Sequence, residues 1–422
     1  MNFFSKYIEL KGDKGIWIAV GLLAIFSLLV VYSSTANITL RANVSPFGYF
    51  IKHFAFLAVG FIIIYVLSRV RYTIFMSAAK LGYYASLALL LAMLVLGQTY
   101  NQAARTLAGF QPAELAKVAL ILFMAERITA KQEMIKSFGQ GFWRVLWPFS
   151  LTCLIIFMSN FSTAAILAIT CMVMVFVGRA KLVHLLATVL TVAALFAALM
   201  GFTHAVVTFT DGMGRTNQPL SGFWKTSQTV INKTRLHTMY SRVTAYASSD
   251  SEANRNSRTQ ADYAHAALVA GGGFWGVGPG NSQMKYRLPE AFSDFVYAIV
   301  VEEYGLVSSI FLVVLYLIIM FRVGVIVRRA NRFFPAMLAI GIGTQITLQA
   351  LVHVWVVVGL LPVTGQNLPF ISQGGSSIIF TCIMLGMLLS VSRYVDEQEA
   401  EEAVAAEQIA VAKPMPEPVV AT

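Results

Sequence analysis

Charged residues are scarce in this sequence. Only 12% of its 422 residues are charged, whereas 57% are hydrophobic. Near-continuous apolar stretches of about 20 residues, the length that crosses the hydrocarbon core of a bilayer, recur along the chain. This composition argues against a water-soluble domain. It predicts an all-α integral membrane protein with many spans.

Cysteines are scarce as well. Cys153, Cys171 and Cys382 are the three in the chain, and all lie inside apolar segments. Their spacing matches neither a metal site nor a disulfide framework, so we interpret them as packing residues. A cleavable signal is also missing, because the first apolar run, from about Ile16, is too long and lacks a small-residue cleavage site. We expect that run to remain as the first helix.

Acidic residues are outnumbered, with 20 Asp and Glu against 31 Lys and Arg, which gives a net charge of +11. The basic residues lie in short loops between apolar runs and form no stripe interleaved with exposed aromatic residues. This pattern argues against nucleic-acid binding and is typical of membrane proteins with basic cytoplasmic loops.

The apolar runs predict ten transmembrane helices, at residues 16–34, 49–68, 76–98, 113–127, 147–159, 163–178, 183–203, 295–321, 334–359 and 371–393. The basic residues concentrate in the loops that join helices 2–3, 4–5, 6–7 and 8–9. By the positive-inside rule both termini are then cytoplasmic, and the long loop 204–294 between helices 7 and 8 faces outward.

Three regions follow from this topology. Residues 1–15 form a cytoplasmic N-terminus and 16–394 the membrane domain. Residues 395–422 are rich in acidic residues and proline, which predicts a disordered cytoplasmic tail. Within the outer loop, apolar residues from Leu236 to Tyr246 recur at helical spacing. They predict a short amphipathic helix, either lying on the membrane surface or packed over the mouth of the bundle.

A first group of polar residues surrounds the start of the fourth helix. Pro112 suits the first turn of a helix, and Glu114 and Lys117, three residues apart, lie on one helix face. Lys117 would sit one to two turns below the outer surface, where a charged side chain lines a cavity or forms an ion pair. Either a functional site that includes Arg105 or a structural Glu114–Lys117 pair explains the pattern.

A second group is built around Asp294, where the outer loop meets the eighth helix. Helical spacing places Glu302 on the same face as Asp294, roughly 12 Å below it. Two such carboxylates could bind a cation, relay a proton or act as a base and its partner. Asp294 could also serve as a helix N-cap.

Two glycine-rich segments complete the candidates. Residues 271–280 resemble a nucleotide-binding loop only weakly, because no strand precedes them and Pro279 interrupts the pattern. We interpret them as backbone packed close to the bundle mouth. Residues 359–377 contain prolines and glycines that predict a broken, partly re-entrant connection, which could hold an anionic or hydroxylated substrate. A transporter would fit this local pattern equally well.

Three separated motifs resemble the SEDS family (shape, elongation, division, sporulation) of ten-helix peptidoglycan glycosyltransferases. They are Gln111-Pro-Ala-Glu-Leu-Ala-Lys117, Leu288-Pro-Glu-Ala-Phe-Ser-Asp-Phe295 with Glu302-Glu303, and Leu361-Pro-Val-Thr-Gly365 continuing to Ile371-Ser-Gln-Gly-Gly-Ser376. The resemblance extends from about Trp17 to Arg393. It is strongest to the division-type branch of Bacteroidetes-like bacteria, with the elongation-type branch as runner-up.

The resemblance implies polymerisation of lipid II at the outer face of the cytoplasmic membrane, at the division septum. Asp294 would act as the base or as the ligand of a divalent cation, Mg²⁺ or Mn²⁺. Arg105 and Lys117 would stabilise the departing diphosphate, and Glu114 would position Lys117. The expected substrate-binding residues are Gln111, Glu302, Thr364, Ser372, Gly374, Gly375 and Ser376.

The expected partners are lipid II, a glycan linked to undecaprenyl diphosphate, a class B penicillin-binding transpeptidase and other division proteins. Two rival functions remain. A lipid II flippase would use the same cavity, Lys117 and the broken connection to move the lipid, and a division-site scaffold would recruit partners through the acidic tail and the outer loop. The sequence departs from the family pattern at Thr106, at residues 159–163, at Phe292 and at His353. The loss of an acidic residue near Asn160 argues against catalysis by that turn.

Overall fold

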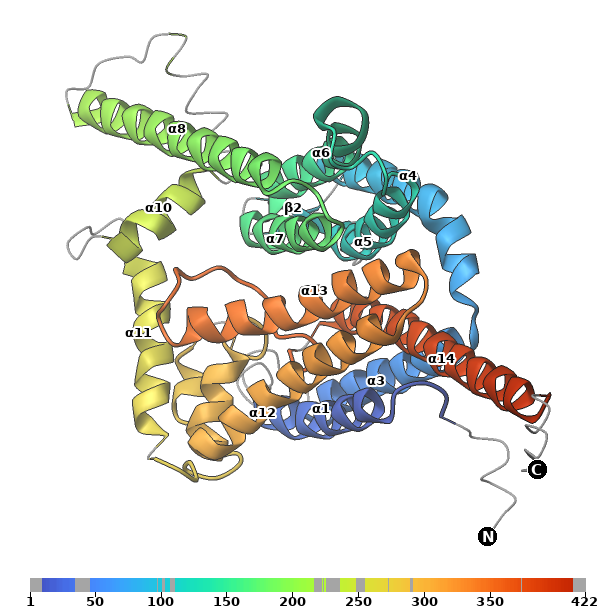
Figure 1. The fold of residues 1–422 in the computed structure, drawn as a ribbon. Helices are drawn as coiled ribbons and strands as arrows, with labels where there is room; N and C mark the ends of the chain where they lie inside the picture. Colours follow the sequence, from blue (N-terminus) through green and yellow to red (C-terminus); the bar gives the residue numbers. More distant parts are fainter. Residues whose placement is uncertain are drawn as a thin grey trace, which may run out of the picture.

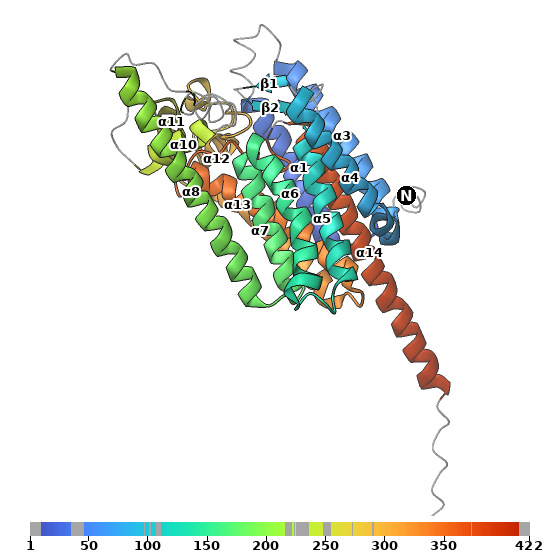
Figure 2. The ribbon, with the colours of Figure 1, turned by 90° about the horizontal axis from the view of Figure 1, so that it is seen from above.

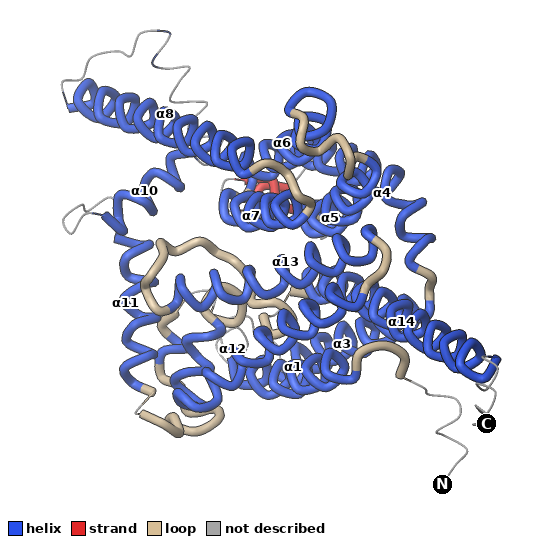
Figure 3. Tube along the Cα trace, viewed as in Figure 1, coloured by secondary structure: helices blue, strands red, loops and turns tan. Residues whose placement is uncertain are grey.

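Long helices make up most of the protein, and the structure is a computed structural model (Figures 1 and 3). It describes residues 10–34, 46–96, 98–100, 103–106, 111–215, 222, 224, 236–247, 255–271, 273–288, 291–372 and 374–412. The long helices are α1 (Lys14–Ser34), α3 (Pro46–Arg69), α4 (Tyr72–Leu96), α5 (Pro112–Ala130), α6 (Trp143–Ser159), α7 (Phe161–Val177), α8 (Leu182–Arg215), α12 (Val296–Arg329), α13 (Phe333–Val357) and α14 (Gly375–Ala412).

Shorter elements connect these helices. They are a two-stranded antiparallel sheet of β1 (Gln98–Tyr100) and β2 (Ala103–Thr106), a π-helical turn η1 (Phe138–Phe142), helices α10 (Leu236–Ala247) and α11 (Arg255–Ala270), and a 3₁₀ turn η3 (Met284–Tyr286). The sequence analysis predicted α10 but neither the sheet nor α11.

A helix forms at each of the ten predicted positions. Eight segments in the described part of the chain are long and apolar enough to cross a membrane: α1, α3, α4, the stretch Phe138–Ser159, α8, α12, α13 and α14. Helix α7 is apolar but has only 17 residues. Helix α5 is less apolar, because it carries four charged residues, Glu114, Lys117, Glu126 and Arg127. That all ten cross the membrane remains a prediction.

Several predicted boundaries were wrong. Helix α8 continues to Arg215, beyond the expected end at 203, and α12 continues to Arg329. Residues 395–412, expected to be disordered, are helical and form the end of α14. The guanidinium group of Arg329 forms ion pairs with Asp396 and Glu399, which tie this part of α14 to the end of α12. These ion pairs help to explain why α14 continues so far. The segment is also rich in Ala and Glu, which are good helix formers.

The helices run side by side, with most of the shorter elements gathered at one end (Figure 2). At that end lie β1, β2, α10 and α11, whereas the last turns of α14 project past the other end. The closest packing is between α3 and α14, between α12 and α13, and between α4 and α5. Helix α8 lies at the periphery and packs chiefly against α10 and α7 (Figure 1).

An ion pair fixes the start of α1 to α12. Asp13 Oδ1 accepts a hydrogen bond from the backbone amide of Ile16 at 3.0 Å and so caps α1. The same carboxylate accepts a hydrogen bond from Arg322, with Nε 2.8 Å from Asp13 Oδ2. A buried carboxylate that caps a helix and pairs with an arginine fixes the position of α1 along α12.

Candidate functional site

Asp294 lies in a turn, residues 291–295, that immediately precedes α12. The residue that caps α12 is Phe295, and no side chain makes a capping hydrogen bond there. The N-cap interpretation of Asp294 is therefore wrong. Asp294 is half-buried, and Ser293 Oγ donates a hydrogen bond to its Oδ1 at 3.3 Å. Asp294 is therefore not required as a cap to start the helix.

The loop between α13 and α14, residues 358–374, holds this turn in place. Ser372 Oγ donates to the carbonyl oxygen of Ser293 at 2.6 Å and accepts from the amide of Leu368 at 2.7 Å. Ser372 thus uses its hydroxyl to join the two segments. The substrate-binding role expected of Ser372 stays a prediction, and its visible role is to fix the position of the Asp294 turn.

Gly365 and Arg242 lie next to the Asp294 carboxylate. A Cβ atom on Gly365 would lie 2.9 Å from Asp294 Oδ2 and 4.0 Å from Arg242 Nη1. Arg242 extends from α10 and donates to the carbonyl oxygen of Val363 at 3.2 Å. Helix α10 therefore packs over the bundle mouth, the second of the two arrangements considered for it. It also brings a cation to the neighbourhood of Asp294 that the sequence analysis did not include in the site.

Lys117 and Glu114 form the predicted ion pair, with Nζ and Oε2 2.8 Å apart on one face of α5. Lys117 is 1% exposed, and its Nζ also donates to Gln349 Oε1 on α13 at 3.2 Å. Gln349 Nε2 in turn donates to the carbonyl oxygen of Asn367 at 2.9 Å. Gln349 therefore links the buried Lys117 ammonium to the 358–374 loop, which is also the loop next to Asp294.

The two other residues expected near Lys117 occupy the entrance of α5. Gln111 is the N-cap residue of α5, with Pro112 following at the first helical position, as predicted, and the Gln111 side chain makes no capping bond. Arg105 belongs to β2, but its side chain lies outside the described part of the structure. The roles expected of both residues stay predictions.

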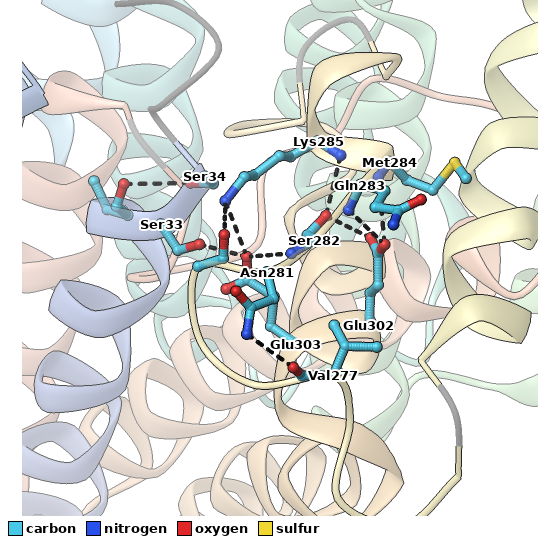
Figure 4. A network of polar contacts seen from close by, with 12 residues as sticks. Ser33, Ser34, Val277, Asn281, Ser282, Gln283, Met284, Lys285, Glu302 and Glu303 are labelled. Carbon is cyan, nitrogen blue, oxygen red and sulfur yellow. Dashed lines mark hydrogen bonds and ion pairs between the residues drawn. The ribbon is translucent and has the colours of Figure 1, made fainter.

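Glu302 does not lie beneath Asp294 on a shared helical face. Asp294 precedes the helix, so the helical count between the two residues does not apply. The Glu302 carboxylate instead accepts hydrogen bonds from Ser282 Oγ at 2.5 Å and from the amides of Gln283 and Met284 at 2.9 and 3.3 Å (Figure 4). These bonds hold η3, which explains the burial of Glu302 without any contact to substrate.

Glu303 binds a second set of partners in the same network. Its Oε1 accepts from Ser33 Oγ on α1 at 2.5 Å and from the amide of Ser282 at 3.3 Å, and it lies 3.5 Å from Lys285 Nζ (Figure 4). Lys285 Nζ also donates to the carbonyl oxygen of Gly280 at 2.6 Å. Both Glu303 and Lys285 are buried, so this group joins the outer segment to α1 and α12.

The glycine-rich segment 271–280 packs against a break in α12. Gly305 has φ +75° and interrupts the helix, and a Cβ there would lie 2.5 Å from the amide nitrogen of Gly276. The amides of Leu306 and Val307 donate to the carbonyl oxygens of Gly273 and Phe274. Close backbone approach, the interpretation favoured for this segment, is confirmed.

The remaining residues of the predicted binding set lie at the end of the 358–374 loop. Thr364 is half-buried, and its Oγ1 has no hydrogen-bond partner among the residues that the structure describes. Gly374 and Gly375 line a cavity of about 340 Å³, and Ser376 is half-buried in the first turn of α14. Gly374 and Gly375 thus border a cavity, whereas the Thr364 hydroxyl is buried, and the binding roles expected of these residues stay predictions.

Asn160 has a structural role in this region. Its Oδ1 accepts from the amide of Thr163 at 3.4 Å and caps α7. Gln366 Nε2 donates to Asn160 Oδ1 at 3.3 Å and to Thr163 Oγ1 at 2.9 Å, and Gln366 O lies 2.6 Å from His353 Nδ1. These residues fix the 358–374 loop to α7 and α13.

Metal ligands are few in the described residues. They include no group of three or more His, Cys, Asp and Glu side chains that could hold a metal ion. A divalent cation at Asp294 would complete its coordination with water or with oxygens of the substrate, as Mg²⁺ commonly does with phosphates.

Comparison with known proteins decides the family. The model of the cell cycle protein family FtsW/RodA/SpoVE matches residues 13–397. The chain belongs to this family. The SEDS membership that the three motifs predicted is thereby confirmed.

Individual relatives align with this chain over most of its length. A probable peptidoglycan glycosyltransferase FtsW from Coxiella burnetii is 29% identical over 391 residues, which cover 89% of this chain and 95% of the relative. Stage V sporulation protein E of Bacillus subtilis is 30% identical over 383 residues, covering 88% and 94%. The Bacteroidetes-like origin stays a prediction.

Solved structures share the fold at lower identity. One, from a study of polymerisation and crosslinking by a peptidoglycan synthase complex, superposes with a TM-score of 0.69 at 20% identity, covering 92% of this chain and 99% of that one. The rod shape determining protein RodA of Thermus thermophilus gives 0.60 at 20% identity, covering 90% and 97%. These matches establish the fold of this SEDS protein.

Proposed function

We propose that this SEDS protein is a peptidoglycan glycosyltransferase that polymerises lipid II at the outer face of the cytoplasmic membrane, for septal wall synthesis. The match of residues 13–397 to the family model carries the proposal, because relatives that cover most of the chain are named as probable peptidoglycan glycosyltransferases. The 358–374 loop supports it, because this loop contacts the Asp294 turn through Ser372 and is linked to Lys117 through Gln349.

The reaction forms one glycosidic bond and breaks one bond to phosphate. The 4-hydroxyl of the acceptor GlcNAc attacks the anomeric carbon of the donor glycan, and the bond from that carbon to the undecaprenyl diphosphate breaks. Asp294 takes the hydroxyl proton as general base. Asp294 is half-buried in a turn that Ser372 holds in place, and a fixed carboxylate of this kind suits a general base.

The departing diphosphate needs positive charge. Lys117 supplies a buried ammonium whose stabilising effect is large because water is excluded around it. Glu114 orients that ammonium through the 2.8 Å ion pair. Arg105 would add a second cation at the entrance of α5. If a divalent cation takes part, Asp294 would hold it together with diphosphate oxygens, and it would supply further charge for the leaving group.

A polymerisation assay with the purified full-length protein and its class B transpeptidase partner tests the function. Asp294→Asn should abolish glycan formation from lipid II, whereas Asp262→Asn, an exposed carboxylate on α11, should retain the wild-type rate. Glycan formed in detergent also argues against a flippase, because no second compartment exists there. Wild-type polymerisation by Asp294→Asn would refute the catalytic assignment.

The topology and the division role are part of the same proposal. Ten spans with both termini in the cytoplasm predict that cysteines introduced near residue 5 and residue 418 react only with membrane-permeant reagents. Labelling of either one by an impermeant reagent in intact cells would refute this topology. Depletion of the protein should give filaments, whereas rounded cells would indicate an elongation role.

A further inference from the structure

The cavity that Gly374 and Gly375 line lies on the α3 side of the Asp294 turn, and its lining is mainly apolar. It has a volume of about 340 Å³, and one wall is the face of α3 that carries Tyr49, Lys52, His53 and Phe56, spaced at three and four residues. Phe292, two residues before Asp294, forms another wall. The cavity therefore adjoins the proposed catalytic turn but shares none of its lining residues with the Lys117 site.

The walls of this cavity are fixed by contacts. His53 is buried, and its Nε2 lies 2.7 Å from Ser27 Oγ, which donates to the carbonyl oxygen of Phe370 at 2.8 Å. Because the Ser27 proton is used in that bond, His53 Nε2 must be the donor to Ser27, and the ring orientation is set. The Phe56 ring fills the space that a side chain at Gly375 would occupy, with ring atoms 2.4 to 2.8 Å from a Cβ there.

The charge of the cavity is positive. Lys52 is exposed and none of the lining residues is acidic. The first amides of α14 follow directly from Gly374 and Gly375, and the N-terminal amides of a helix favour an anion. A lysine beside Tyr49 and Phe56, on a helix at the outer end of the bundle, also suits the boundary between lipid tails and phosphate headgroups.

The Lys117 site and this cavity both lie next to the 358–374 loop. Gln349 connects Lys117 to the carbonyl oxygen of Asn367. The Asn367 side-chain amide lies 3.2 Å from the position of a Cβ on Gly374, which lines the cavity. Lys117 and the cavity that Lys52 lines are thus both connected to one short loop, and Ser372 attaches the Asp294 turn to that loop.

Polymerisation of a lipid-linked glycan needs two cationic sites, one for each diphosphate. The donor and the acceptor each carry a diphosphate on a polyprenyl chain, but only the donor diphosphate leaves. A leaving group gains most from a buried cation such as Lys117, whereas the acceptor diphosphate keeps its bonds throughout and needs only an anchor. An exposed lysine is sufficient to anchor the acceptor diphosphate.

We propose that the cavity lined by Lys52, His53 and Phe292 binds the diphosphate of the acceptor lipid and so presents its sugar to Asp294. This assignment rests on the glycosyltransferase function proposed above. Lys52 contributes the charge, Phe56 and Phe292 border the first part of the lipid chain, and the His53 ring, held by Ser27, forms a fixed part of the wall without donating to the anion.

Steady-state kinetics of the full-length protein with its transpeptidase partner test this site. The lipid II concentration is varied while a preformed lipid-linked glycan donor is kept saturating. Lys52→Gln should raise the KM for lipid II about tenfold, the loss expected for one charge-assisted hydrogen bond, and change kcat less than about twofold. Lys52→Arg should restore most of the affinity. Lys181→Gln, an exposed lysine in the loop before α8, is the matched control and should behave as wild type.

Three results would overturn the proposal. The first is an unchanged KM in Lys52→Gln, and the second is a fall in kcat with an unchanged KM. The third is an effect of Lys52→Gln that appears only in vesicles containing phosphatidylglycerol and not in phosphatidylcholine alone, which would assign the cavity to an ordinary anionic phospholipid. Lys117→Gln and Asp294→Asn are measured in parallel. If they are inactive while Lys52→Gln is normal, only this inference fails. If Lys117→Gln and Asp294→Asn are both active, the catalytic assignment fails, and if the wild-type protein forms no glycan, the proposed function fails.

Discussion

The carboxylate of Asp294 occupies the space that a side chain on Gly365 would need. A Cβ at position 365 would lie 2.9 Å from Asp294 Oδ2, and Gly365 has φ +66°, in the left-handed region that favours glycine. Two segments separated by about 70 residues of sequence therefore depend on each other locally. The 358–374 loop can approach Asp294 only because residue 365 lacks a side chain.

Gly365→Ala should reduce activity with little loss of folded protein. The new methyl group must displace the Asp294 carboxylate, and a displacement of about 1 Å can lower a rate about 100-fold. Polymerisation rate and thermal unfolding in detergent are the measurements. Gly273→Ala is the matched control, since Gly273 has φ +105° but open space around its Cβ position. Equal activity of the two variants would indicate that the contact with Asp294 is unimportant.

Lys117→Gln should lower kcat by a factor on the order of 100 to 1,000, because a preorganised positive charge at the leaving group is lost. Glu114→Gln should have a smaller effect, since Lys117 would keep its bond to Gln349 and lose only the counter-charge. Single-turnover rates with saturating lipid II provide the comparison. A normal rate for Lys117→Gln would leave the Glu114–Lys117 pair with a structural role alone.

Lys285→Met should destabilise the protein by about 3 to 5 kcal/mol, because it leaves the buried Glu303 carboxylate without its cation. The double variant Lys285→Met with Glu303→Gln should recover part of that loss, since no uncompensated charge remains. Unfolding midpoints of the wild type, both single variants and the double variant form the test. Strictly additive effects would show that the two side chains do not interact.

The same variants report on the position of Asp294. The segment that contains Lys285 leads directly into the Asp294 turn, so loosening it should lower kcat more than it raises KM. A conservative change, Lys285→Arg, should retain most of the activity. Loss of stability with full kcat in the remaining folded protein would separate this network from catalysis.

Removal of divalent cations should lower polymerisation if Asp294 and the diphosphate jointly hold a metal ion. Chelation with EDTA should then stop glycan formation, and added Mg²⁺ or Mn²⁺ should restore it. Tight binding of Mn²⁺ in the presence of lipid II, lost in Asp294→Asn, would be the independent readout. Full activity in EDTA would assign Asp294 to proton abstraction alone.

Local sequence patterns correctly predicted the positions of the long helices. The positions of the long helices followed from apolar runs, because burying a helix in lipid requires a continuous apolar stretch whatever its neighbours are. Pro112 correctly marked the start of α5, and the spacing of Glu114 and Lys117 correctly predicted their ion pair. Each of these features depends on residues within one or two helical turns.

Long-range contacts escaped prediction. The count that placed Glu302 beneath Asp294 assumed a continuous helix, but the first carboxylate lies in a turn and the second binds η3. The contribution of Arg242 depends on α10 folding back over the 358–374 loop. No local spacing encodes such a contact, because the partners lie more than 100 residues apart.

The sequence by itself determined that this is a helical membrane protein of the SEDS family and which three motifs carry its polar residues. The tertiary structure decided how those motifs meet. Ser372 holds the Asp294 turn, Gly365 makes room for its carboxylate, and Gln349 connects Lys117 to the same loop. Helix periodicity is a property of neighbouring residues, whereas the geometry of a site depends on which helices pack together and on the loops that their packing brings into contact.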